Sequence, residues 1–193
     1  MVMILVLPDL HLDHWHAARR DPFTHLSTEW REGIHHCIVA GDLINDGTRR
    51  WPRVLEWLSR QLPCARIAIF PGNHDFYEGR IDREDKLRAA AEQAGATYAQ
   101  KTVLEIGRTR LLCCTLWTDF NLFGAAAQPS AMYDARRLMN DNRSIRVERG
   151  NFRRLHPEDT VSIHLDHRAW LERELSRPWG GRHGRRNPPR PAS

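Results

Sequence analysis

The sequence lacks the features that mark disulfide-rich and membrane-spanning proteins. Its 4 cysteines include no C-x-x-C pair, so we expect free thiols in a reducing compartment. No apolar run approaches the roughly 18 residues that span a bilayer. The apolar start at 2–7 has neither a basic segment nor a small-residue cleavage site, which predicts a first strand rather than a signal peptide. We therefore expect a cytoplasmic protein without membrane contact.

Lysine is also scarce, because only Lys86 and Lys101 among the 29 basic residues are lysines and the rest are arginines. The formal net charge is +5, but the stretch 178–193 has four arginines and no acid. The rest of the chain is thus close to neutral. A dedicated nucleic-acid binder usually has a strongly basic domain, so we expect nucleic acid as a partner only if it is the substrate.

Apolar strands alternate with amphipathic helices over the first half of the chain, which predicts an α/β domain with a mostly parallel sheet. Strands are expected at 2–7, 36–40 and 66–70, followed by a hairpin at 102–106 and 109–115. Helices are expected from Trp51 to Pro63 and at 87–94, with Trp51 in the core and Trp57 at its rim. A last helix is expected from Pro157, with a buried face of Ile163, Trp170, Leu171 and Leu175.

Metal-ligand side chains follow each of the first three expected strands. The three segments are Asp9-Leu10-His11, Gly41-Asp42 and Gly72-Asn73-His74-Asp75. Parallel strands have their carboxyl ends at one edge of a sheet, so these side chains are expected to converge there. We expect Gly72 to permit a sharp turn after its strand. Taken singly, Asp9 and Asp75 are equally well explained as turn caps; the three segments in order predict a metal site.

This ordered set resembles the calcineurin-like metallophosphoesterase superfamily. Three further segments, at 116–124, 139–146 and 156–164, make it similar to the small bacterial metallophosphatases of that superfamily. The resemblance implies an α/β fold, the amino-terminal part of a two-sheet αββα sandwich. It runs over residues 1–181, and an Arg/Pro-rich, disordered tail is expected at 182–193.

The resemblance implies hydrolysis of a phosphoester at two divalent cations, with a metal-activated hydroxide as the nucleophile. Asp9, His11 and Asp42 would hold the first cation, while Asp42 and Asn73 would hold the second. Nitrogen and oxygen ligands together favour manganese, iron or zinc. His74 would protonate the leaving oxygen or stabilise charge, and Asp75 is expected to orient His74. Other residues that would line the pocket, or equally well form core hydrogen bonds, are Asp119, Asn140, Asp141, Arg143 and His164.

The second half of the family pattern, a T-H-H-type and a G-H-x-H motif with three histidines, is not found in this sequence. When the codons for 183–191 are shifted by one base, they can encode Thr-Val-Val-Val-Thr-His-His-Ala-Pro. A single-base frameshift near Arg182 is therefore our hypothesis, and it predicts a truncated domain with an uncovered hydrophobic face. It also predicts a weak or empty second metal site and little turnover of a chromogenic phosphodiester with added manganese.

Two other functions remain open on the sequence. A non-catalytic nucleic-acid binder would use the basic tail, and salt-dependent binding lost on deletion of 178–193 would favour it. An HD-type phosphohydrolase would use the pair His74-Asp75, but that chemistry places its ligands on helices, whereas this pair is expected after a strand. Monoester or diester preference, natural substrate and oligomeric state are not determined by the sequence.

Overall fold

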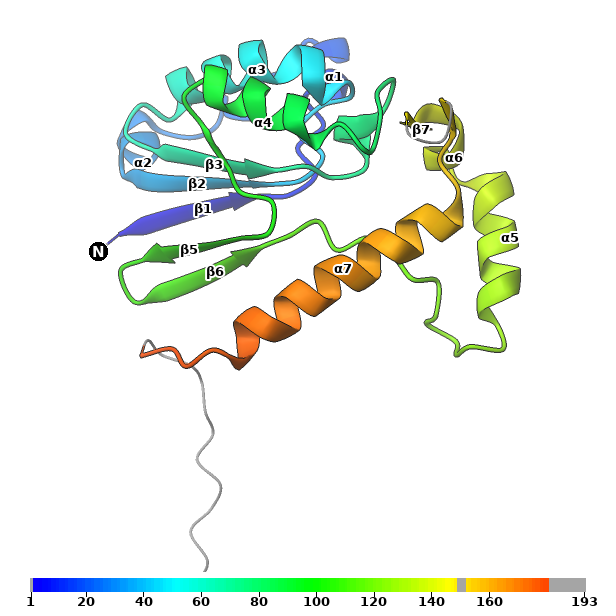
Figure 1. The fold of residues 1–193 in the computed structure, drawn as a ribbon. Coiled ribbons are helices and arrows are strands. Elements are labelled where there is room, and N and C mark those ends of the chain that lie inside the picture. The colour runs from blue at the N-terminus through cyan, green and yellow to red at the C-terminus, as the bar shows by residue number, and fades with distance from the viewer. Residues whose placement is uncertain (1, 149–151, 181–193) are drawn as a thin grey trace, which may run out of the picture.

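A four-stranded parallel sheet forms the centre of the computed structural model, which describes residues 2–148 and 152–180 (Figure 1). The strands lie in chain order, and each pairs in parallel with the next. Their bounds are β1 Met3–Leu7, β2 Ile34–Ala40, β3 Arg66–Phe70 and β4 Thr97–Tyr98. Because all four strands run the same way, the segments that follow β1, β2 and β3 emerge at one edge. The prediction of an α/β fold with a parallel sheet is confirmed.

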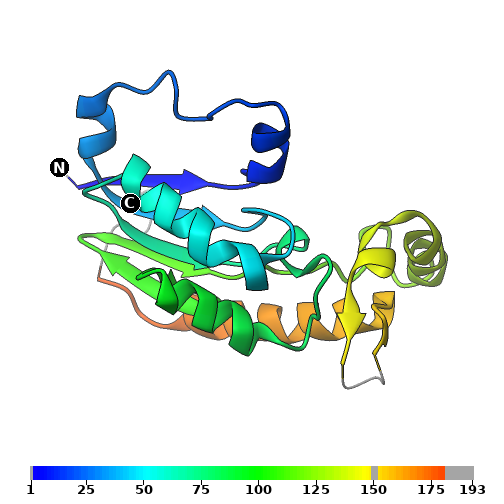
Figure 2. The same ribbon diagram turned by 90° about the horizontal axis from the view of Figure 1, so that it is seen from above.

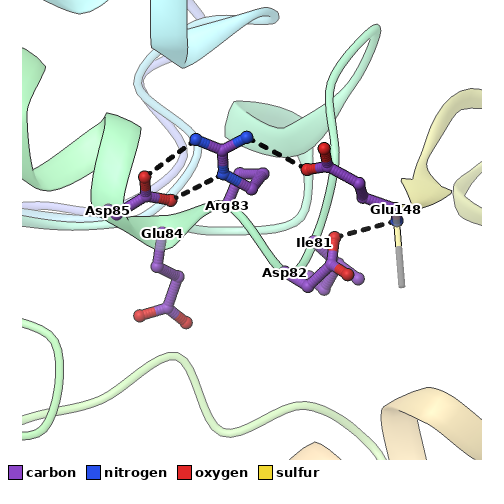
Figure 3. Close-up of a pocket in the computed structure, with 6 residues that line it drawn as sticks. All are labelled: Ile81, Asp82, Arg83, Glu84, Asp85 and Glu148. Carbon is purple, nitrogen blue, oxygen red and sulfur yellow. Dashed lines mark hydrogen bonds and ion pairs between the residues drawn. The ribbon is translucent and has the colours of Figure 1, made fainter.

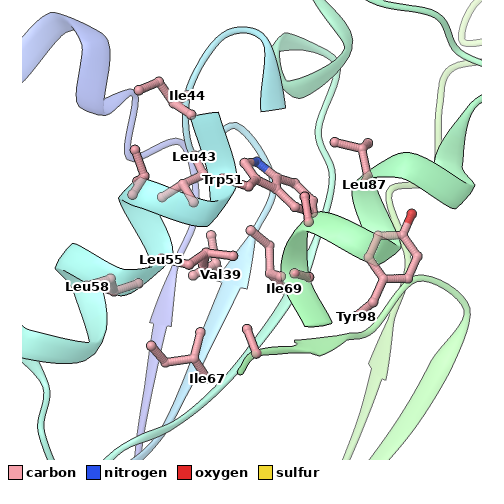
Figure 4. Packing of buried hydrophobic residues seen from close by; sticks show 14 of the residues in the cluster. Val39, Leu43, Ile44, Trp51, Leu55, Leu58, Ile67, Ile69, Leu87 and Tyr98 are labelled. Atoms are coloured by element: carbon pink, nitrogen blue, oxygen red, sulfur yellow. The ribbon is translucent and has the colours of Figure 1, made fainter. Parts of the chain in front are cut away.

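Helices α3 (Gly47–Gln61) and α4 (Glu84–Gln93) cover one face of this sheet (Figures 1 and 2). Val39 and Ile69, paired across β2 and β3, point into the helix layer and are fully buried there. They pack with Trp51 of α3 and Leu87 of α4 (Figure 4). Each such side chain contributes roughly 1.5–3 kcal/mol through its burial, so this core holds the strand ends in fixed relative positions.

The other face of the sheet packs against a hairpin of β5 (Thr102–Ile106) and β6 (Thr109–Cys113). Ile38 and Ala68, which alternate with the residues of the first core, form a second buried cluster with Cys113. Figure 1 shows the hairpin beneath β1, with the long helix α7 (Pro157–Ser176) beyond it. The hairpin predicted around Gly107 is thus confirmed.

Short elements lie at the two ends of the sheet. Before β2 come α1 (Leu12–Ala17) and α2 (Thr28–Glu32), and a 3-10 turn η1 (His74–Phe76) follows β3. Beyond β6 the chain forms α5 and α6 and then a small two-stranded ladder, which lie together away from the hairpin (Figure 1). Their bounds are α5 Gln128–Leu138, α6 Asp141–Ser144, β7 Arg146–Val147 and β8 Arg153–Arg154.

The buried face predicted for α7 is wrong at its carboxyl end. Leu175 is 59% exposed, whereas its neighbour Glu174 is buried. Glu174 accepts a hydrogen bond from Arg177 at 2.6 Å, so its charge is paired where it is buried. With Glu174 turned inward, the next residue along the helix must lie on the outer side.

The four cysteines are free, as predicted. Among the described residues no helix has the length and apolar character needed to cross a bilayer. The predicted tail at 182–193 lies outside the described residues. The predicted boundary at 181/182 therefore stays a prediction.

Candidate metal centre

The segments that follow β1, β2 and β3 meet at one cavity of about 310 Å³, which Asp9, Asp42 and Asn73 line together. Backbone hydrogen bonds join the first two segments. The Asp9 N–H donates to the Gly41 carbonyl at 3.2 Å, and the His11 N–H donates to the Asp42 carbonyl at 2.9 Å. The parallel ladder thus continues into the loops, and it fixes the distance between these side chains.

Left-handed backbone occurs repeatedly at this edge. Asp9, His11 and Asp42 have φ of 50°, 43° and 52°. This conformation costs a non-glycine residue about 1–3 kcal/mol and persists where the surrounding structure imposes it. Three such residues side by side indicate that the fold tolerates strain here to aim these side chains at one point.

Gly72 matters because it has no side chain, and not because of its backbone angles. Its φ is not in the left-handed range, so the prediction that the turn needs its conformational freedom is wrong. A Cβ on Gly72 would lie 2.1 Å from Asp42 Oδ1 and 2.7 Å from the Asp42 backbone nitrogen. The carboxylate of Asp42 therefore occupies the space that any other side chain at position 72 would need.

The donor atoms at this edge are close enough to share a cation. Ligand atoms of His11, Asp42 and His74 lie within 4.8 Å of one another, and His11 Nε2 is 3.7 Å from Asp42 Oδ2. Nδ1 of His11 is buried without a hydrogen-bond partner among the described residues. A buried polar atom without a partner is costly, and this donor set of imidazole and carboxylate suits a transition metal. His11 and Asp42 fit a divalent cation, and His74 lies beside them.

Electrostatics at Asp42 also favour a cation. Burial raises the pKa of the Asp42 carboxyl, the neighbouring Asp9 raises it further, and the N–H of His74 lowers it by donating at 2.9 Å. The carboxylates of the exposed Asp9 and the buried Asp42 repel each other, and a positive ion between them would offset that repulsion. His11 also belongs to a second group with Asp13 and His14, of which His14 is exposed.

Asn73 is held by a residue far along the chain. Its Nδ2 donates to Asp141 Oδ1 at 2.8 Å, and the Tyr77 hydroxyl donates to the same oxygen at 2.7 Å. Burial and the Asp141 carboxylate raise the pKa of Tyr77, which keeps its hydroxyl protonated as a donor. Because the nitrogen end of the Asn73 amide is used, its oxygen end is left for a cation.

His74 is oriented by Asn45 and not by Asp75, so the role predicted for Asp75 is not supported by its contacts. His74 Nδ1 lies 2.9 Å from Asn45 Oδ1, and the ring stacks on Tyr77 with centroids 4.2 Å apart. Asp75 instead accepts hydrogen bonds from Trp51 Nε1 at 2.9 Å and from the N–H groups of Gly72 and Ile44. The physical reason is that adjacent side chains of the 3-10 turn η1 point in different directions. The side chain of Asp75 therefore points into the core and not toward the ring of His74.

Asp75 is therefore a structural tie between the loops that follow β2 and β3. It is 1% exposed, and burial raises its pKa to about 7 although its three donors oppose this. It does not line the cavity of about 310 Å³. Its carboxylate connects α3, through Trp51, to the loop that holds Asn73 and His74.

Of the further pocket residues considered from the sequence, the structure places only Asp141 in the lining of the cavity. Asp119 forms an ion pair with His164 at 3.7 Å, and His164 also bonds to the carbonyl of Trp117. The cavity has other lining residues that sequence reasoning missed, among them Thr115, Thr118 and Met139. Thr118 and Met139 lie in the segments 116–124 and 139–146 that carry the family resemblance, and Thr115 directly precedes the first of these segments.

A different cavity, of about 660 Å³, is rich in acids but lacks metal-site geometry (Figure 3). Arg83 occupies its centre and forms ion pairs with Asp85 at 2.9 Å and Glu148 at 3.0 Å. Two of the acidic side chains are thus already paired with this guanidinium. The residues that could hold a metal ion lie at the strand ends instead.

Comparison with known protein families identifies a match for this chain. The family model for calcineurin-like phosphoesterases matches residues 2–186 of the 193. A search of curated proteins found no match. Since the match spans nearly the whole chain, the prediction of a truncated domain is not confirmed.

Proposed function

The chain belongs to the calcineurin-like phosphoesterase family, and from this premise we propose that it hydrolyses a phosphoester at divalent cations held by the β1, β2 and β3 ends. One observation supports the proposal above all others. The segments after three separate strands bring His11, Asp42 and His74 within 4.8 Å of one another, beside a cavity that a phosphoryl group can enter.

Asp9, His11 and Asp42 would hold the first cation, and Asp42 and Asn73 the second. When bound, a pair of divalent cations acidifies water and offsets the charge that develops on phosphoryl oxygens. Mixed nitrogen and oxygen donors favour manganese, iron or zinc. The second set has only two oxygen donors, so we expect it to bind its cation weakly.

His74 is the proposed general acid. An amide oxygen only accepts hydrogen bonds, so the contact with Asn45 Oδ1 requires a proton on His74 Nδ1. When the ring carries a proton on both nitrogens, Nε2 is the atom that can give a proton to the leaving oxygen, and general acids of this kind contribute about 100- to 10,000-fold. The hydrogen bond from the His74 N–H to Asp42 fixes the ring relative to the metal ligands.

A manganese titration tests this function. We expect little turnover of bis(4-nitrophenyl) phosphate with one equivalent of Mn²⁺ and a rise through the millimolar range, because the second site is weak. Asp42→Asn should abolish the turnover. His74→Gln should lower it about 100-fold or more while calorimetry still detects the first Mn²⁺.

The matched control is His25→Gln, which changes an exposed histidine away from the cavity and should leave turnover unchanged. The proposal fails if the wild-type chain shows no turnover at any Mn²⁺ concentration. It also fails if Asp42→Asn hydrolyses the diester as fast as the wild type.

A further inference from the structure

A third cavity, of about 760 Å³, lies between α1 and α3 and is lined mainly by basic side chains. Its lining includes one carboxylate, from Asp13, together with His16 and Trp57. The arginines that line it are Arg49, Arg50, Arg53 and Arg60. Neither the fold nor the proposed metal centre requires this concentration of guanidinium groups.

The arginines follow from the two-faced pattern of α3. Its inner face, which includes Trp51 and Leu55, is fully buried against the sheet. Arg50, Arg53 and Trp57 lie at i, i+3 and i+7, so they share one outer stripe of the helix. Because the side chains of this stripe do not pack into the core, they are available to bind a ligand.

Two of these guanidinium groups have no acidic partner. Arg49 pairs with Asp46 at 3.4 Å and Arg60 with Glu56 at 2.8 Å. Among the residues that the structure describes, neither Arg50 nor Arg53 forms an ion pair. The cavity therefore offers unbalanced positive charge to an anion, and guanidinium groups match the geometry of phosphate.

Trp57 adds a flat apolar surface to the same cavity. It is half-buried, and its ring is held edge-on by Phe23 at 5.6 Å and His16 at 6.5 Å between centroids. A ring fixed in this way loses little entropy when a ligand stacks on it. Arginines beside an aromatic ring are the combination that binds single-stranded nucleic acid, through its phosphates and its bases.

The basic cavity adjoins the metal centre. Asp13, in its lining, has a ligand atom within 4.8 Å of one on His11, and His11 stands in the same relation to Asp42. Arg49 also lines a further cavity of about 360 Å³, with Arg80 and Arg146. Positive charge thus extends along both sides of the α3 amino terminus, close to the strand ends.

We propose that this cavity binds the nucleotides that flank the scissile phosphate of a single-stranded nucleic acid. The inference rests on the proposed function and gives its site a substrate class, a phosphodiester chain. Arg50 and Arg53 contact backbone phosphates, and Trp57 stacks on a base. A small diester has no flanking nucleotides, so its hydrolysis does not depend on these three side chains.

Binding and turnover are measured separately to test this. The probe is a fluorescein-labelled 12-nucleotide oligodeoxythymidine, whose anisotropy is followed with EDTA present at several KCl concentrations. We expect Arg50→Ala/Arg53→Ala to weaken binding at least tenfold. The slope of log K against log salt should also become shallower by about 1.4, since each phosphate contact on a single strand contributes about 0.7.

A matched pair removes the same charge elsewhere. Arg108→Ala/Arg168→Ala changes two exposed arginines outside the cavity and should leave affinity and slope within twofold of wild type. Trp57→Leu should weaken binding roughly tenfold without changing the slope, because stacking displaces no counterion. Each variant should hydrolyse bis(4-nitrophenyl) phosphate at the wild-type rate.

The inference is overturned if both arginine pairs weaken oligonucleotide binding equally. It is also overturned if deletion of 182–193, and not the change at Arg50 and Arg53, removes binding, or if these arginines support binding only to anionic lipid vesicles. Its failure differs from failure of the proposed function. A chain that binds the oligonucleotide through Arg50 and Arg53 but never hydrolyses the small diester contradicts the hydrolase proposal alone.

Discussion

Replacement of Gly72 by alanine tests how closely the metal centre depends on space. The added Cβ would lie 2.1 Å from Asp42 Oδ1, and ordinary contact begins at about 3.4 Å. The carboxylate therefore has to move by about 1.3 Å. The Asp42 backbone nitrogen, at 2.7 Å, has to move as well, and backbone held by the ladder yields less easily than a side chain.

Two measurable losses follow from this displacement. Overpacking costs about 1–3 kcal/mol, and the backbone contact places Gly72→Ala near 3 kcal/mol. For a chain of this length that corresponds to a fall in Tm of roughly 6–12 °C. A misplacement of about 1 Å can lower turnover about 100-fold, and the shifted Asp42 should bind the first Mn²⁺ at least tenfold more weakly.

Thermal unfolding followed by circular dichroism and Mn²⁺ calorimetry measure these effects. The matched control is Gly95→Ala, because Gly95 has φ of +75° but no atom within 4 Å of an added Cβ. It should lose stability through backbone strain while its Mn²⁺ affinity stays unchanged. If Gly72→Ala unfolds at the wild-type temperature and binds Mn²⁺ normally, the close approach of Gly72 and Asp42 does not hold the site together.

Three other predictions concern single contacts. Asp141→Ala removes the acceptor of two hydrogen bonds and should lower the free energy of unfolding by about 2–4 kcal/mol, whereas Tyr77→Phe should lower it by about 1.5. In urea unfolding the double variant should be no less stable than Asp141→Ala alone, and full additivity would contradict the shared acceptor. Asn45→Ala removes the oxygen that faces His74 Nδ1 and should lower turnover of bis(4-nitrophenyl) phosphate more than Asn45→Asp, which keeps an oxygen acceptor there. Burial lowers the pKa of His167 below 6.5, so the unfolded state binds more protons and stability should fall as pH drops through 6.5. His167→Gln should show a smaller fall between pH 7.5 and 5.5, and an unchanged fall would exclude His167 as its source.

The contacts that the sequence did not predict join residues that lie far apart in the chain. The motif predicts His74 as the general acid and the adjacent Asp75 as its partner. The structure gives that place to Asn45, 29 residues away. The sequence predicts Asp141 as one of five equivalent pocket residues, and the structure distinguishes it by its place in the cavity lining and by its contact with Asn73, across 68 residues. Local spacing contains no information on which distant loops meet.

The sequence by itself determined β1, β2 and β3 with the helices α3 and α4, and it placed Asp9, Asp42 and Asn73 after three strands that end together. Apolar periodicity specifies these features, because it depends on residues within one or two turns of each other. Tertiary structure alone decided that Gly72 gives its space to Asp42, that Asp75 turns into the core, and that α3 presents a basic stripe to a cavity. Each of these features depends on how helices, strands and loops pack against one another. That packing is fixed only when the whole chain is folded.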